Sequence, residues 1–288
     1  MRRFLKLTAV LLILSAAVLC LSVPTFVTET QSPPVGQTYM TVEEAVVQLR
    51  EAMERRESPV TVVFYSAKPE SAEMGQTLFY SAIAHTGVPT EGDYIYRHVS
   101  GLKFNCETES LDEGYLSTTT YTITYRSTAD QEARVSEKVG QILNQLDVYD
   151  GTDYEKVLAI YNYLCSHITA PAITDAIDHT AYGALIEERA VCQGFASAFY
   201  RLALELGVDN RLLSGKVGEV KHGWNIVAID GFYYHVDATK DAGVSSDKYR
   251  HFLKSDLPTH KRDAEYSTEE FNGNYPVGEK DYDPHKHA

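Results

Sequence analysis

A cysteine at the start of a strongly helical stretch constrains this chain more than any other feature of its sequence. Cys192 follows an irregular approach, residues 189–191. After it, apolar residues recur three and four positions apart until Gly207: Phe195, Ala198, Phe199, Leu202, Ala203 and Leu206. This spacing predicts a helix with Cys192 in its first turn, where the helix dipole and unpaired N–H groups stabilise the nucleophilic thiolate. The position alone also fits a small buried hydrophobe, as most free cysteines are.

A histidine and an aspartate follow the helix at matching ends of a predicted hairpin. Strand-like segments flank Asp230-Gly231, a dipeptide typical of two-residue hairpin turns. That turn predicts a register in which Ile229 pairs with Phe232, so His222 lies at the same end as Asp237. The carboxylate would then fix the imidazole tautomer and leave the other ring nitrogen facing a thiol. The order Cys, His, Asp therefore predicts a catalytic triad.

Three runs together resemble the bacterial transglutaminase-like superfamily, a papain-related group of cysteine enzymes: AVCQGFASAF (residues 190–199), HGWN (222–225) and DGFYYHVDAT (230–239). Residues 179–185 and 249–256 resemble its lead-in and closing segments, so the resemblance covers residues 150–260.

The resemblance implies roles for three residues of this chain. Cys192 is the expected nucleophile, His222 the base and Asp237 its orienter. The family often has Trp after the D-x-T motif, where this chain has Lys240, a difference expected to change the substrate cleft and not the triad.

The fold class that the resemblance implies is α+β, with a papain- or transglutaminase-like core in which the cysteine helix packs on an antiparallel sheet.

The expected reaction is acyl transfer on protein or peptide amides through a cysteine thioester, with hydrolysis favoured over cross-linking. We expect the Cys192 N–H to bind the oxyanion, with Gln193, Tyr182 and Trp224 as further candidates for the oxyanion hole or cleft. We expect no cofactor and no metal. The alternative is a catalytically silent cell-surface interaction module on the same fold.

The N-terminal segment, residues 1–28, has the pattern of a signal peptide or a membrane anchor. Arg2, Arg3 and Lys6 precede an uncharged, mostly apolar run, residues 7–23. The protein is therefore expected to be exported, either secreted or held at the membrane through this segment alone. Residues 29–38 contain Ser-Pro-Pro and read as a linker.

Residues 39–127 read as a small α+β domain. A capping box, Thr41 with Glu44, opens a first helix. The remaining elements expected in this domain are a strand at 60–65, a helix at 71–86 and strands at 93–105 and 115–125. No catalytic spacing occurs in this stretch, so a role in positioning substrate, in binding a partner or as a spacer stays open.

Residues 128–262 read as the catalytic domain, and residues 263–288 as a polar, loosely ordered tail. Helices are expected at 129–146 and at 152–168, the second opened by a capping box of Thr152 and Glu155. His285 and His287 lie in the tail without a rigid support, and we assign them no metal.

The charge of the chain excludes one class of partner. With 40 acidic and 26 basic residues it carries a formal charge of −14, which repels phosphate backbones and argues against nucleic-acid binding. The expected partner is a protein or peptide substrate, with cell-wall peptide as one candidate.

Cys106 and Cys165 could pair in an exported protein, but two cysteines do not make a disulfide framework, and we favour free thiols.

Overall fold

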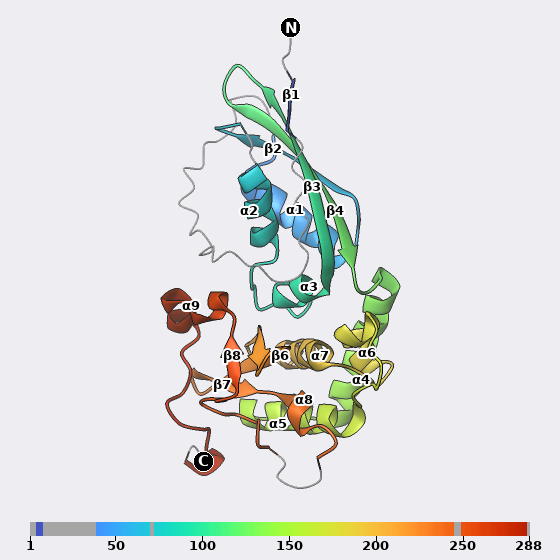
Figure 1. The fold of residues 1–288 in the computed structure, drawn as a ribbon, viewed down its shortest axis with the longest axis vertical. Helices are drawn as coiled ribbons and strands as arrows, with labels where there is room; N and C mark the ends of the chain where they lie inside the picture. Colours follow the sequence, from blue (N-terminus) through green and yellow to red (C-terminus); the bar gives the residue numbers. More distant parts are fainter. Residues whose placement is uncertain (1–3, 8–38, 70–71, 245–248, 287–288) are drawn as a thin grey trace. The chain divides into compact units, whose positions relative to one another are not determined.

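The computed structural model describes residues 4–7, 39–69, 72–244 and 249–286, and it divides the chain into two compact units (Figure 1). The first unit holds residues 1–84 and 99–125, and the second holds 85–98 and 126–288. Residues 85–98, placed by the sequence analysis in the N-terminal domain, thus cluster with the catalytic segment. Asp93 ties them there, because its carboxylate accepts bonds from Arg211 Nε (2.7 Å) and the Leu212 N–H (2.9 Å).

The first unit is an antiparallel sheet with helices on one face. Its strands are β1 (Phe4–Leu7), β2 (Val60–Ser66), β3 (Val99–Ser110) and β4 (Tyr115–Tyr125), in the order β1-β3-β4-β2. Helices α1 (Val42–Glu54) and α2 (Ala72–Ala82) lie against the sheet (Figure 1). Tyr121 in β4 donates to the Gly75 carbonyl of α2 at 2.8 Å, and the capping box at Thr41 is confirmed.

Two expectations for the N-terminal part need comment. Apart from β1, the segments 1–28 and 29–38 lie outside the described residues. Within the part of the chain that is described, no helix has both the length and the apolar character needed to cross a bilayer. The strand expected at 93–105 is wrong at its start, because α3 (Asp93–His98) precedes β3. The Asp93–Arg211 ion pair fixes this turn of helix and overrides the β-propensity of its aromatic residues.

The second unit places a helix that begins at Cys192 against an antiparallel sheet, which confirms the expected α+β fold. Its helices include α4 (Ala129–Leu146), α5 (Asp153–His167), α6 (Ala181–Leu185), α7 (Cys192–Glu205) and α8 (Ala238–Asp241). Its strands β5 (Asn210–Val217), β6 (Val220–Ile229), β7 (Phe232–Val236) and β8 (His260–Arg262) lie in the order β7-β6-β5-β8.

The hairpin register expected from the Asp230-Gly231 turn is confirmed. Ile229 pairs with Phe232, and the pairing continues to Asn225 with Val236. Asp230 and Gly231 both have positive φ, 53° and 82°, as a type I′ turn requires. The capping box at Thr152 is confirmed as well.

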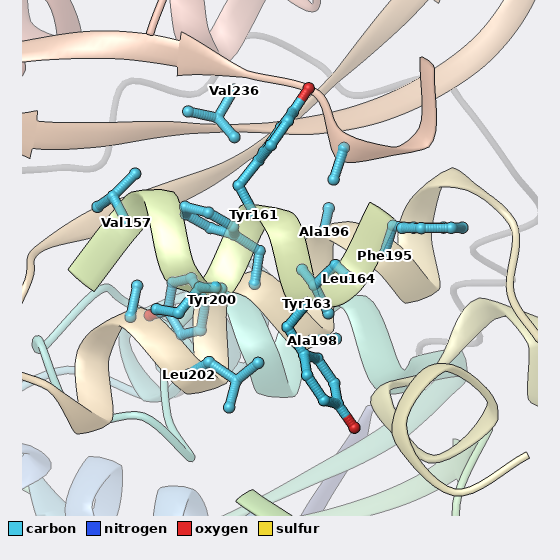
Figure 2. Packing of buried hydrophobic residues seen from close by; sticks show 14 of the residues in the cluster. Val157, Tyr161, Tyr163, Leu164, Phe195, Ala196, Ala198, Tyr200, Leu202 and Val236 are labelled. Carbon is cyan, nitrogen blue, oxygen red and sulfur yellow. The ribbon is translucent and has the colours of Figure 1, made fainter. Parts of the chain in front are cut away.

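The core of this unit lies between α5, α7 and the sheet. Figure 2 shows side chains from α5 and α7 within one buried cluster, with Val236 of β7 beside them. Tyr161 and Leu164 of α5 and Ala198 and Leu202 of α7 are at most 1% exposed. This packing holds α7 rigidly, and with it the position of Cys192 at its start.

The loosely ordered tail expected at 263–288 is wrong for its described part. A 3-10 helix (Ala264–Ser267) and α9 (Glu269–Asn274) follow β8. Tyr266 and Phe271 are 5% and 8% exposed, and they join Trp224 in a second buried cluster. Two aromatic residues spaced within a polar stretch are enough to anchor it.

A close backbone contact at the start of α7 leads to a stability prediction. A Cβ on Gly194 would lie 2.5 Å from the Asp178 carbonyl oxygen and 2.8 Å from the Ala190 Cβ. We therefore expect Gly194→Ala to lower the free energy of unfolding by about 1–3 kcal/mol. The measurement is denaturant unfolding followed by circular dichroism.

Gly140→Ala in α4 is the matched control. A Cβ there meets nothing within 4 Å, so the change should raise stability by about 0.5–1 kcal/mol through helix propensity. Equal behaviour of the two variants would contradict the close packing at Gly194.

Candidate active site

Cys192 occupies the first position of α7, as the sequence predicts. The first backbone hydrogen bond of the helix runs from the Phe195 N–H to the Val191 carbonyl (3.1 Å), and Val191 provides no side-chain cap. The N–H groups of Cys192 and Gln193 therefore precede the helical ladder. The thiol itself is half-buried. It lies where helix dipole and backbone donors favour an anion.

An ion pair between Arg189 and a buried aspartate fixes the loop that precedes Cys192. Arg189 donates to both carboxylate oxygens of Asp178, from Nε at 2.7 Å and from Nη2 at 3.0 Å. These bonds hold the pKa of Asp178 below its ordinary value. The Asp178 carbonyl also accepts the Val191 N–H at 3.0 Å. The residue before the cysteine is thus bound to the backbone of the fully buried Asp178.

His222 and Asp237 meet at one end of the hairpin. His222 lies in β6, and its Nε2 is 2.6 Å from Asp237 Oδ2. Asp237 follows β7 directly, caps α8, and accepts the Thr239 N–H at 3.1 Å through Oδ1. With Nε2 bound to the carboxylate, His222 lies beside Cys192, and its hydrogen bonding and charge lower the pKa of the thiol. The structure therefore brings the three residues predicted as a triad together.

Opposing effects set the protonation of the Cys192–His222 pair. Burial by itself raises the pKa of the Cys192 thiol, but the hydrogen bond and charge of His222 and a bond from the Gly223 N–H bring it below its ordinary value. Burial by itself lowers the pKa of His222, but its bonds to Asp237 and Cys192 raise it to about 9. Each group favours the charged form of the other, which shifts the pair toward thiolate and imidazolium.

Asp237 has a second histidine that the sequence analysis missed. His260 of β8 places its Nε2 2.9 Å from the same Oδ2 that His222 contacts. Burial by itself raises the pKa of Asp237, but the bonds from His222 and His260 hold the pKa well below its ordinary value. The carboxylate is thus ionised although only 1% exposed. No motif marks His260, since it lies in a three-residue strand after the last of the quoted motifs, residues 249–256.

The candidates for the oxyanion hole differ in what their polar groups already bind. Gln193 Nε2 donates to the Arg97 carbonyl (2.6 Å) and the His179 carbonyl (3.1 Å). Trp224 is 1% exposed, and its Nε1 donates to His235 Nδ1 at 3.0 Å. The Tyr182 hydroxyl accepts a bond from Arg134 Nη1. The side-chain N–H groups of Gln193 and Trp224 thus have internal partners, and the backbone N–H groups at the start of α7 are the donors beside the thiol.

The cluster of His222, Asp237 and His260 offers donor atoms within 4.8 Å of one another. Its nitrogen–oxygen distances of 2.6 and 2.9 Å are those of hydrogen bonds. Ligands on a tetrahedral zinc lie about 3.3 Å apart, given bonds of 2.0–2.1 Å. The geometry fits two N–H groups sharing one carboxylate oxygen, and we assign no metal to it.

One family model matches the segment that carries the candidate site. The model of the transglutaminase-like superfamily matches residues 140–238, a segment that contains Cys192, His222 and Asp237. This segment is therefore similar to that superfamily. Kyphoscoliosis peptidase from Homo sapiens is 27% identical over 136 residues, which cover 42% of this chain and 20% of the human protein. The match therefore spans about a fifth of that relative's length.

The similarity to solved structures is weaker. One described as a TGase is 14% identical at a TM-score of 0.36, covering 66% of this chain and 57% of that one. The periplasmic domain of TgpA from Pseudomonas aeruginosa is 11% identical at a TM-score of 0.28, covering 50% and 73%. The similarity to the superfamily rests on the family model and not on these structures.

The raised pKa of His222 yields a prediction. Asp237→Asn removes the carboxylate that stabilises the imidazolium, so the pKa of His222 should fall from about 9 to near or below the ordinary histidine value of about 6.5. In the wild type, this bond contributes stability that is complete below the unfolded pKa and is lost as pH rises through about 9. The measurement is an NMR titration of ¹⁵N-labelled histidine, with His222→Gln used for assignment.

Asp209→Asn provides the control, because it removes a carboxylate from His85 in the same unit, where the pair is 3.0 Å apart. His222 should titrate as in the wild type. An unchanged His222 titration in Asp237→Asn would show that the carboxylate does not hold the proton.

Proposed function

We propose that this chain, whose residues 140–238 are similar to the transglutaminase-like superfamily, is a cysteine enzyme that transfers the acyl group of protein or peptide amides through a thioester. The observation that supports this proposal most is the interaction of His222 with both Cys192 and Asp237. Each of the three residues by itself could have a purely structural role. A protein that only binds a partner, however, does not need a histidine that lowers the pKa of a half-buried thiol, nor a buried carboxylate that orients this histidine.

The first half of the reaction uses the charges already in place. The Cys192 thiolate attacks the amide carbonyl carbon, a C–S bond forms, and the carbonyl electrons move to oxygen. The N–H of Cys192, which lies before the helical ladder of α7, is placed to bind that oxyanion. As the tetrahedral intermediate collapses, the C–N bond breaks, and the His222 imidazolium gives its proton to the departing amine.

The second half releases the acyl group. Neutral His222 takes a proton from water as the water oxygen attacks the thioester carbonyl. The C–S bond then breaks, the acid departs, and Cys192 and His222 return to the thiolate–imidazolium pair. Asp237 keeps its charge throughout and holds His222 in one tautomer.

We propose water, and not a second amine, as the acceptor. Lys240 is exposed in α8, three residues after Asp237, at the position where the family often has Trp. A cation there disfavours the approach of a substrate lysine, which is itself cationic near neutral pH. This supports a protease or amidase over a cross-linking enzyme.

We also propose that the enzyme works outside the cytoplasm, on proteins or peptides at the cell surface, with cell-wall peptide as one candidate substrate. The support is the basic start and apolar run of residues 1–28. Membrane attachment, where it occurs, would use this segment only.

Alkylation by iodoacetamide tests the activated thiol. At pH 6 an ordinary thiol is less than 1% ionised, whereas the Cys192–His222 pair keeps the thiolate. We expect rapid labelling of Cys192 at pH 6, and a loss of about tenfold or more in His222→Ala. The rate at each cysteine is measured by peptide mass spectrometry, and Cys192→Ala confirms the assignment.

Cys165 is the internal control, because its Sγ lies 3.5 Å from the Ala238 carbonyl and it is not part of the proposed triad. Its labelling rate should not change in His222→Ala. If Cys192 behaves as Cys165 does, the triad is not assembled and the interaction-module reading replaces the enzyme.

The choice of acceptor has its own test. We expect a peptide library treated in ¹⁸O-water with a primary amine added to yield mainly ¹⁸O-labelled acids, and Cys192→Ala to yield none. A majority of amine adducts would identify a cross-linking enzyme, although the same thioester would have formed.

A further inference from the structure

His260 lies outside every motif of the triad, yet it contacts the triad directly. We infer that His260 is a positioning residue, which shares the Asp237 carboxylate oxygen with His222 and so limits how strongly that carboxylate retains the His222 proton. The inference rests on the proposed function, because it concerns the proton that His222 must release to a leaving amine.

The hydrogen bonds around Asp237 show that His222 and His260 share one of its carboxylate oxygens. Oδ2 lies 2.6 Å from His222 Nε2 and 2.9 Å from His260 Nε2, while Oδ1 accepts the Thr239 N–H at 3.1 Å. All three partners are N–H donors to an ionised carboxylate. The other nitrogen of His260, Nδ1, lies 3.2 Å from Thr259 Oγ1.

Packing leaves the His260 ring little freedom. Its side chain is 1% exposed. The ring lies edge-on to Trp224, with centroids 5.0 Å apart, and edge-on to His222 at 5.3 Å. Trp224 is in turn fixed by its bond to His235. A ring confined on these sides keeps its Nε2 directed at Asp237.

Strand β8 brings His260 to the triad. His260 pairs with Val217 of β5, and Arg262 pairs with Gly215, which itself lies opposite His222 of β6. A Cβ on Gly215 would collide with the Lys261 carbonyl oxygen. Glycine at this position thus permits β8 to approach closely, and His260 then lies on the same face of the sheet as His222.

The charged and titratable groups near His260 are few among the described residues. Beside Asp237 and His222, the ring of His251 lies 6.1 Å away and is bound to Asp241 at 2.7 Å. His260 also borders a polar cavity of about 270 Å³, whose other titratable lining residues are His235, Asp256 and Arg262. Of these groups, those bonded to Asp237 are His222 and His260.

The chemical consequence follows from dividing one charge between two donors. A carboxylate that bonds only one imidazolium stabilises its proton strongly and makes it a poor acid. A second N–H on the same oxygen withdraws part of that negative charge, so His222 gives up its proton more readily to the leaving amine. His260 also keeps Oδ2 directed at His222.

Replacing His260 by residues with and without a donor tests the inference. In His260→Phe the ring volume stays and the N–H is lost, so the His222 titration should move upward by about one pH unit, a tenfold rise in proton affinity. His260→Gln keeps an N–H donor, and its His222 titration should stay within a few tenths of the wild-type midpoint. Both are read by ¹⁵N-histidine NMR on the full chain, with thermal unfolding as the check of folding.

His85→Phe is the matched control, because it removes a histidine from the Asp209 carboxylate elsewhere in the unit. It should leave the His222 midpoint unchanged. If His260→Phe does not fold, His260→Met supplies the comparison without a donor.

Iodoacetamide labelling of the same variants separates the two hypotheses. Wild-type Cys192 that fails to label at pH 6 would overturn the proposed function itself. Rapid wild-type labelling, together with a His222 midpoint in His260→Phe that is unmoved or lower, overturns the role of His260 alone. An upward shift in His260→Phe that His260→Gln reproduces also overturns it, because the donor would not be the cause.

Discussion

The charge of one buried carboxylate organises the candidate site. Asp237 is 1% exposed and ionised, and an isolated charge in such surroundings is highly unfavourable. Three N–H groups offset that cost, and they come from β6, from β8 and from the first turn of α8. The sheet must therefore bring His222 and His260 together from strands on either side of β5, and the chain must turn into α8 directly after Asp237. Helix α8, the glycine at 215 and strand β8 all serve this requirement.

The thiol depends on the same carboxylate through a chain of opposed effects. Burial raises the pKa of Cys192 and lowers that of His222, so each group by itself would be neutral. Their mutual charge, strengthened on the histidine side by Asp237, reverses both tendencies. The start of α7 contributes its free N–H groups, and the Gly223 N–H contributes a bond to the sulfur. Activation is therefore a property of helix, hairpin and carboxylate together, and no single residue carries it.

The sequence predicted the parts of this site that depend on local patterns. Apolar spacing located α7, and the Asp230-Gly231 turn fixed the register that places His222 near Asp237. Helix α3 and His260 depend on contacts far along the chain. Asp93 is 118 positions from its partner Arg211, and β8 is three residues long, too short for strand alternation to be recognised. The helices of the described tail were not predicted, because its two buried aromatic residues stand in an otherwise polar stretch.

The segment 85–98 shows why such distant contacts matter to the chemistry. The chain leaves the first unit before His85 and returns to it after His98, so this segment belongs to the second unit while linking two parts of the first. Its Arg97 carbonyl accepts the Gln193 amide at 2.6 Å, one residue after the candidate nucleophile. Gln193 therefore has a structural use that its position next to Cys192 conceals. An amide that binds two backbone carbonyls holds the first turn of α7 in place. An oxyanion formed in the proposed reaction would then rely on backbone N–H groups, whose direction the helix itself fixes.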